Sequence, residues 1–346
     1  MNDMLTLDKG VLLSNRFTRS VCLVRDVHRQ DAIDDYILTP IGRDVLRRIA
    51  NALRGDSSTR AWSLTGPYGS GKSAFALFVT QLLAGEESIR LRAREYLASQ
   101  DSELAVLLHG SSGPLAEERT RFCPVLVSGS RQPLEKALAT SLATSLRAVT
   151  KRGRPPQLIE RLEGLATQET PSSTALVGYF EEANEYLRRF GPNAAGILLI
   201  IDELGKFLEY GASNPARSDI FVLQELAELA ARSERPFLVF TILHQSIDRY
   251  IDHLSPGRRV EWAKIQGRFE DVAFEDRSEQ MLRLLARAIQ HRGDSTFIKS
   301  LKQRAKALAQ EVIALGIRVG TMPPTELHEC LTACYPLCPL TDLYSR

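Results

Sequence analysis

One stretch of eight residues constrains this chain more than any other. It fits the pattern G-x-x-x-x-G-K-[ST] and reads Gly66, Pro67, Tyr68, Gly69, Ser70, Gly71, Lys72 and Ser73. An apolar run at residues 62–65 precedes it, and an apolar stretch of helical character at residues 74–79 follows it. The pattern therefore predicts a buried strand, a tight loop and a helix in direct succession.

The chemistry of a triphosphate explains why these residue types occur together. Glycines let backbone N–H groups converge closely on an anion, and a helix that begins near Gly71 aims its positive end at the same phosphates. Lys72 can reach the terminal phosphates, and the Ser73 hydroxyl can ligate magnesium. We expect this loop to bind ATP with Mg²⁺. A glycine-rich turn formed by chance is the alternative.

Composition is that of a soluble globular protein, with 44% hydrophobic and 25% charged residues. A net charge of +2 gives no reason to expect a nucleic-acid-binding protein, although it is compatible with a local basic patch. No apolar run approaches the roughly 20 residues that span a bilayer, and the first residues lack the apolar core of a signal peptide. Five cysteines in 346 residues do not make a disulfide framework. We expect a cytoplasmic protein.

Two adjacent acidic residues follow the most apolar run of the chain. Residues 197–201 are all aliphatic, which predicts a strand buried on both faces, and Asp202 and Glu203 come directly after it. Ligands of α/β sheets bind at the carboxyl ends of strands. Asp202 is expected to hold magnesium, and Glu203 is expected to polarise a water molecule for attack on the γ-phosphate.

A further apolar run, at residues 236–243, predicts another buried strand, and His244 and Gln245 lie at its tip. A polar side chain beside the acidic strand can sense the γ-phosphate or orient the attacking water. Both residues are candidates for that role. The alternative is that they only cap the helix that follows.

The remaining segments show weaker patterns. Residues 21–24 are predicted to form a short strand, and residues 123–129 a buried one. Residues 41–53 have helical spacing and either contact the nucleotide base or simply pack. Residues 158–189 predict a helical insertion or hairpin. The basic turn at residues 151–156 is expected to be a solvated loop rather than a phosphate contact.

Residues 262–274 and the helical run that follows resemble AAA+ ATPases. The resemblance implies that Arg268 acts as an arginine finger on the nucleotide of a neighbouring subunit, with Arg258 and Arg259 as weaker alternatives. The competing interpretation is a structural arginine paired with Glu270 or Asp271. The helices at residues 278–289 and 297–315 would then form a lid. The place of a second sensing arginine, at residues 320–325, contains none.

A closer resemblance is to the large P-loop ATPases of bacterial defence systems, including BREX-type phage resistance. It covers residues 15–340 and is carried by the phosphate loop, by residues 201–209, by residues 243–245 and by residues 266–269. Those proteins are usually far longer, so the chain resembles a shortened member or an ATPase fragment. The resemblance implies a homo-oligomer or a larger defence complex, and DNA as a possible partner.

Near the carboxyl end, His328, Cys330, Cys334 and Cys338 lie close together. Such ligands can bind zinc, but the spacing is not a paired C-x-x-C, and buried cysteines are often only small apolar residues. A metal site here is therefore the less favoured interpretation.

Together these patterns predict an α/β P-loop NTPase of ASCE/AAA+ type, with a parallel sheet flanked by helices and a C-terminal helical lid. We expect an N-terminal segment at residues 1–55, an ATPase core at residues 56–276 with an insertion around residues 151–190, and a lid at residues 277–346. The expected activity is hydrolysis of ATP to drive a change of shape or assembly. The alternative is a non-hydrolysing switch that docks a partner protein or DNA. The acidic pair argues against a small-molecule kinase.

Overall fold

A computed structural model describes residues 11–13, 21–34, 36–117, 120–149, 157–190, 194–245, 250, 262–274, 278–292 and 295–336. The chain divides into two compact units. The core unit comprises residues 21–275, and the C-terminal unit combines residues 276–346 with residues 1–20.

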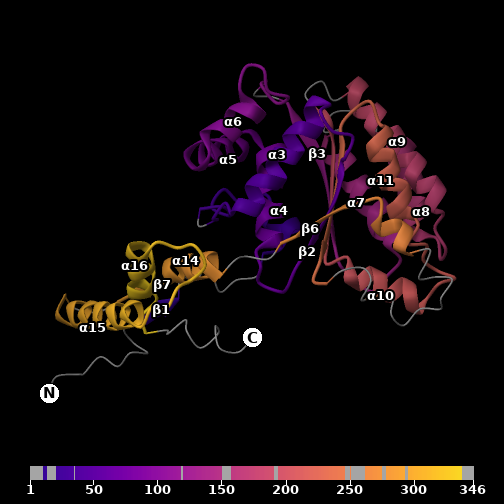
Figure 1. The fold of residues 1–346 in the computed structure, drawn as a ribbon. Helices are drawn as coiled ribbons and strands as arrows, with labels where there is room; N and C mark the ends of the chain where they lie inside the picture. Colours follow the sequence, from indigo (N-terminus) through magenta and orange to yellow (C-terminus); the bar gives the residue numbers. More distant parts are fainter. Residues whose placement is uncertain are drawn as a thin grey trace. The chain divides into compact units, whose positions relative to one another are not determined.

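The core unit is built on a five-stranded parallel sheet with the strand order β3-β4-β5-β2-β6 (Figure 1). In chain order the strands are β2 (Ala61–Thr65), β3 (Arg121–Ser128), β4 (Ala194–Asp202), β5 (Phe237–Leu243) and β6 (Glu270–Ala273). Because neighbouring strands are parallel, their carboxyl ends meet at one edge of the sheet. β5 lies between β4 and β2, although it follows both of them in the chain.

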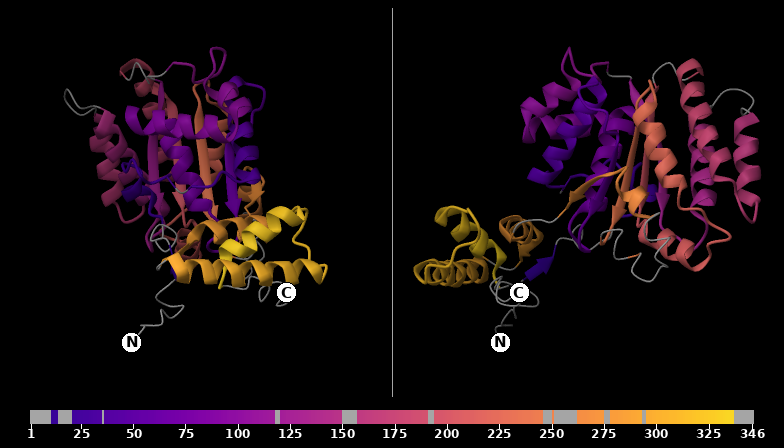
Figure 2. Two further views of the ribbon diagram at one scale, coloured as in Figure 1. Left: turned by 90° about the vertical axis from the view of Figure 1, so that its left-hand side faces the viewer. Right: turned by 45° about the vertical axis from the view of Figure 1, so that its right-hand side comes forward.

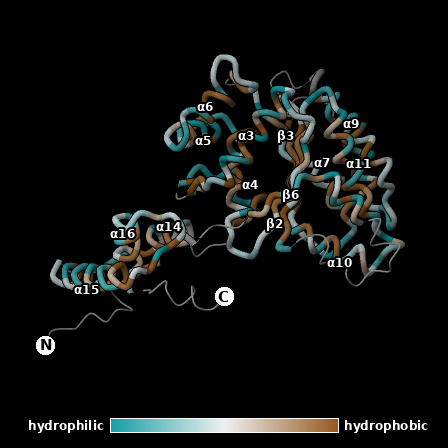
Figure 3. Tube along the Cα trace, in the orientation of Figure 1, coloured by the Kyte–Doolittle hydropathy of each residue, from teal (hydrophilic) through white to brown (hydrophobic). Residues whose placement is uncertain are grey.

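Strand β4 shows why helices must cover both faces of this sheet. Side chains alternate between the faces of a strand. Ile197, Leu199 and Ile201 join one apolar cluster, and Leu198 and Ile200 join the other. Both clusters are fully buried along the strand, so a helical layer lies on each side, as the views in Figure 2 show. The apolar residues follow the strands in the interior of the core unit in Figure 3.

The two helical layers differ in sequence origin. The layer that packs with Leu198 contains α2 (Leu23–Asp26), α3 (Pro40–Arg54), α4 (Lys72–Ala84), α5 (Glu87–Gln100) and α6 (Ser102–His109). The layer on the opposite face contains α7 (Leu134–Val149), α8 (Gln157–Thr167), α9 (Ser173–Phe190), α10 (Gly205–Ser213) and α11 (Val222–Arg232).

The predicted α/β fold with a parallel sheet flanked by helices is confirmed. The prediction of a strand at residues 21–24 is wrong, because helix α2 begins at Leu23. The Asp26 carboxylate accepts a hydrogen bond from the Cys22 N–H at 2.9 Å, and this bond closes a helical turn. The helices of residues 158–189 pack against α7 within the core unit. The basic turn at residues 151–156 lies outside the described residues.

The C-terminal unit has its own apolar cluster. The described part of the unit consists of three helices, α14 (Ser278–Ala288), α15 (Ser295–Ala314) and α16 (Pro324–Cys334), and of two strands. Strand β7 (Ile289–His291) pairs antiparallel with β1 (Val11–Leu13). Arg283 of α14 pairs with Glu326 of α16 at 2.6 Å, and Glu279 accepts hydrogen bonds from Thr321. None of the helices described is long and apolar enough to cross a membrane.

Candidate functional site

The carboxyl edge of the sheet in the core unit gathers three segments that the sequence marks as functional. The phosphate loop follows β2, Asp202 and Glu203 end β4, and His244 follows β5. Since β5 lies between β2 and β4, His244 lies between the loop and the acidic pair.

The backbone of the phosphate loop takes conformations that glycine permits. Gly66 has a φ of 156°, and a Cβ added there would lie 2.5 Å from the carbonyl oxygen of Phe274. The Phe274 N–H donates to the Thr65 carbonyl at 2.6 Å, which holds this segment against the loop. Gly71 caps α4 with a φ of 85° and supplies no side-chain cap. The first N–H groups of α4 therefore have no partner within the helix, which is the arrangement that binds an anion.

Lys72 lies inside the loop rather than on its surface. The residue is only 4% exposed to solvent. The ammonium donates to the Gly66 carbonyl at 2.6 Å, to the Pro67 carbonyl at 2.7 Å and to the Ser70 hydroxyl at 3.1 Å. Burial lowers the pKa of Lys72, and the negative charge of Asp202 opposes this shift. The loop is thus shaped around a buried positive charge.

Ser73 and Asp202 come into contact although they are far apart in the chain. The Ser73 hydroxyl donates to the Asp202 carboxylate at 3.3 Å. Asp202 is 6% exposed, and burial raises its pKa, while the bonds from Ser73 and from the Glu203 N–H lower it. Two oxygen ligands of this kind suit Mg²⁺, which takes one or two carboxylates and completes its coordination with water and phosphate.

Glu203 is held in place through its backbone and its carboxylate. It has a φ of 52°, in the left-handed region that non-glycine residues rarely adopt. A Cβ at Gly129, just beyond the end of β3, would crowd the Glu203 backbone, so two chain segments approach closely here. The Glu203 carboxylate accepts a hydrogen bond from the Lys206 ammonium at 2.6 Å. Backbone strain of this kind often marks functional positions.

The two candidates at the tip of β5 have different surroundings. The His244 ring stacks on the Tyr68 ring of the phosphate loop, with centroids 3.4 Å apart. Neither ring nitrogen of His244 has a hydrogen-bond partner among the described residues. Burial lowers the pKa of His244, and the charges of Lys72 and Lys206 lower it further. Gln245 hydrogen-bonds the side chain of Tyr250 instead.

Arg268 lies at the opposite end of the sheet. It precedes β6, whose last residue, Ala273, is paired with Thr65 just before the phosphate loop. Five residues of strand correspond to about 15 Å. The guanidinium is 53% exposed and pairs with Glu228 of α11 at 3.0 Å, rather than with Glu270 or Asp271. Glu270 bonds Arg48 and Trp62. Arg258 and Arg259 lie outside the described residues.

The described residues of the zinc interpretation, His328, Cys330 and Cys334, all lie on α16. Cys330 and Cys334 are buried in the apolar cluster of the C-terminal unit, and burial raises the pKa of both thiols. No group of three or more His, Cys, Asp or Glu side chains that could hold a metal occurs in the parts of the chain that the structure describes. Cys338 lies outside those parts.

A parallel α/β sheet with this loop between a buried strand and a helix defines the P-loop NTPase fold. The sequence matches no protein-family model and no curated protein. Among solved structures, it is similar to the ORC2 protein of Aeropyrum pernix, determined as ADPNP–ADP complexes. The identity is 12%, the TM-score is 0.39, and the alignment covers 92% of this chain and 74% of that one.

Three contacts of the site were not expected from the sequence. These are the Lys206–Glu203 pair, the Tyr68–His244 stack and the closure of the loop by Phe274. The first had a usable signal, because a lysine three residues after an acid can pair with it when a helix begins between them. The other two join segments about 175 residues or more apart, and no local pattern indicates them.

Proposed function

We propose that the core unit binds ATP with Mg²⁺ and hydrolyses the ATP to ADP and phosphate. The observation that carries this proposal is the 3.3 Å contact between Ser73 and Asp202, beside the buried ammonium of Lys72. It unites a phosphate-binding loop and a metal-binding carboxylate, which is the pair of features that phosphoryl transfer requires.

Each residue then has a defined task. Lys72 holds the terminal phosphates, and the oxygens of Ser73 and Asp202 hold Mg²⁺, which would neutralise charge on the phosphates. Glu203 takes the proton of the attacking water, so its carboxylate must leave Lys206. His244, stacked on Tyr68, is the candidate that contacts the γ-phosphate or the water.

Steady-state hydrolysis and ATP binding by three proteins test this proposal. Glu203→Gln should bind ATP normally and lose at least about 100-fold in kcat, the usual effect of removing a general base. Lys72→Ala should lose ATP binding itself. Glu209→Gln removes an exposed carboxylate of α10 and serves as the matched control with unchanged turnover. Normal turnover by Glu203→Gln would refute the assignment of the base.

A non-hydrolysing switch is the second candidate, and the Lys206–Glu203 bond favours it. A base whose carboxylate is engaged at 2.6 Å is not available to water. If the bond restrains the base, Lys206→Met should raise kcat several-fold, whereas Lys206→Arg should not. A switch would instead bind ATP without turnover in the wild type and in both Lys206 variants, and this result would favour the switch over the ATPase.

We further propose an AAA+ type of assembly in which Arg268 completes the site of a neighbouring subunit. Arg268 is exposed and too far along the sheet to reach its own phosphate loop. Arg268→Ala should therefore bind ATP normally and lose the rise of specific activity with protein concentration. Full activity of Arg268→Ala at every concentration would contradict this role. A function in phage defence is a proposal that rests only on the resemblance of the motifs.

A further inference from the structure

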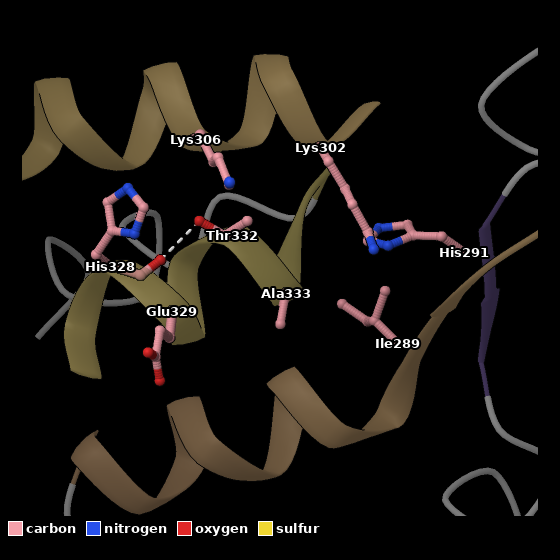
Figure 4. Close-up of a pocket in the computed structure, with 8 residues that line it drawn as sticks. All are labelled: Ile289, His291, Lys302, Lys306, His328, Glu329, Thr332 and Ala333. Atoms are coloured by element: carbon pink, nitrogen blue, oxygen red, sulfur yellow. Dashed lines mark hydrogen bonds between the residues drawn. The ribbon is translucent and has the colours of Figure 1, made fainter. Parts of the chain in front are cut away.

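A groove in the C-terminal unit is lined by basic side chains (Figure 4). It lies between α15, α16 and β7 and encloses about 300 Å³. Lys302 and Lys306 of α15 face it from one side, and His328 of α16 and His291 of β7 contribute imidazole rings. Ile289 and Ala333 supply apolar surface. The groove contains no residue of the candidate nucleotide site, and it shares only His328 with the zinc interpretation.

The lysines form a continuous stripe. Lys299, Lys302 and Lys306 are spaced three and four residues apart, which places them on the same side of a helix. All three are exposed. None of them forms an ion pair with another described residue. Their charges are therefore not neutralised within the described part of the unit.

Of the acidic side chains in the described part of this unit, only Glu329 lines the groove. Helix α15 contains a single acid, Glu311, more than a turn beyond the stripe. On α16, Glu326 is paired with Arg283, and Figure 4 shows the Glu329 carboxylate turned away from Lys306. Residues 278–292 and 295–336 carry eight Lys or Arg against four Asp or Glu, whereas the whole chain carries 44 against 42. The positive excess is thus concentrated in this unit.

Two other polar side chains of the groove already have hydrogen-bond partners in the unit. His291 Nε2 hydrogen-bonds the Tyr335 carbonyl at 2.7 Å, and the Thr332 hydroxyl donates to the His328 carbonyl at 2.7 Å. The ammonium groups of Lys302 and Lys306 remain as donors toward the groove. Recognition here would depend on charge rather than on a fixed pattern of donors and acceptors.

We propose that this groove binds the phosphodiester backbone of a nucleic acid. From Lys299 to Lys306 the helix rises about 10 Å, a length over which one strand of a duplex presents about three phosphates. A single free phosphate would engage only one end of such a stripe. Backbone contacts of this kind position a protein on the duplex without reading its sequence.

The test uses the full chain and a fluorescein-labelled duplex of mixed sequence, about 20 base pairs long, in anisotropy titrations between about 50 and 200 mM KCl. No nucleotide is added, so the result does not depend on the ATPase proposal. Removing both groove lysines, in Lys302→Ala/Lys306→Ala, should weaken binding and reduce the slope of log K against log salt by about 1.8, because each phosphate contact contributes about 0.9.

The matched control, Arg304→Ala/Arg318→Ala, removes two exposed charges of the same unit that do not line the groove. It should keep the wild-type slope. Absence of DNA binding by the wild type, an unchanged slope in the lysine variant, or an equal loss in the control would each overturn the proposal. So would displacement of DNA by inorganic phosphate beyond the effect of KCl at equal ionic strength, or equally tight, lysine-dependent binding of polyglutamate.

Discussion

The charge of Asp202 has a calculable consequence for stability. The side chain is nearly fully buried, and burial is the largest influence on its pKa, which it raises. An asparagine keeps an acceptor oxygen for the Glu203 N–H, which now lies 2.9 Å from the carboxylate. We therefore expect Asp202→Asn to be more stable than the wild type when no nucleotide is bound.

The expected gain follows from two opposing contributions. A hydrogen bond to a charged acceptor contributes about 1.5–3 kcal/mol, and a neutral acceptor contributes less. Burying a carboxylate costs several kcal/mol before such bonds compensate it. The net gain is on the order of 1 kcal/mol, or about 1–2 °C in Tm for a chain of 346 residues.

The gain should depend on pH with a definite sign. Because the pKa of Asp202 is raised in the folded state, the carboxyl costs no stability at pH values below its ordinary pKa of 3.8. The cost grows as the pH rises through the folded-state pKa and is then constant. The advantage of Asp202→Asn should therefore be present at neutral pH and disappear as the pH approaches 3.8.

Bound nucleotide should reverse the order of stability of the wild type and Asp202→Asn. At a concentration of about 100 times its Kd, Mg-ATP bound at the proposed site should stabilise the wild type by about 2.7 kcal/mol. Asp202→Asn should lose the magnesium-dependent part of that increase. Thermal unfolding with EDTA, with ATP and with Mg-ATP measures all three states. A control variant, Asp271→Asn, removes an exposed carboxylate of β6 that accepts from the Thr65 hydroxyl at 3.0 Å, and it should change stability by less than about 0.5 kcal/mol. A lower Tm of Asp202→Asn at neutral pH without nucleotide would refute this reasoning.

Two further positions give sharp expectations. Glu135 is fully buried and accepts from the Asp219 N–H at 2.6 Å, so Glu135→Ala should cost about 3 kcal/mol in urea unfolding. Glu135→Gln keeps an acceptor oxygen. Since burial raises the pKa of Glu135, the stability of this variant should increase relative to the wild type as the pH rises through that pKa. An equal loss of stability in Glu135→Ala and Glu135→Gln would contradict this. Gly66→Ala should destabilise by about 1–3 kcal/mol and abolish ATP binding, because its Cβ would meet Phe274. Gly164→Ala, which meets nothing within 4 Å in α8, should be neutral or stabilising, and the same calorimetric and binding measurements compare the two.

Local chemistry explains which parts of the site were predictable. The phosphate loop and the acidic pair follow strands, and the chemistry of a triphosphate demands these residue types at strand ends. The strand order was not predictable, because β5 follows β4 in the chain yet inserts between β4 and β2. Whether neighbouring apolar strands pair is decided by contacts that are distant in sequence.

One wrong prediction and one unusual burial have a related physical cause. Four residues at 21–24 have no periodicity that separates a strand from a helical turn, and the Asp26 side chain decides for the helix. Glu135 lies near the start of an amphipathic helix, where an acid is usually exposed, but it is buried because Ser218 and the Asp219 N–H satisfy it. In both cases hydrogen bonds to a carboxylate override the local pattern.

If the core unit binds ATP with Mg²⁺ as proposed, the burial of Lys72 and Asp202 predicts that the two ligands bind cooperatively. Burial lowers the pKa of Lys72 and raises that of Asp202, so each charge is only partly compensated by the other. ATP alone brings negative phosphates to Lys72 but also toward Asp202, where like charges repel.

A divalent cation at Asp202 removes that repulsion, and by thermodynamic reciprocity each ligand must strengthen the binding of the other by the same factor. We expect the Kd for ATP, measured by calorimetry, to be at least about tenfold lower with Mg²⁺ than with EDTA, a coupling of about 1.4 kcal/mol. The difference should collapse in Asp202→Asn. Equal affinities in the wild type would show that Asp202 does not face the phosphates.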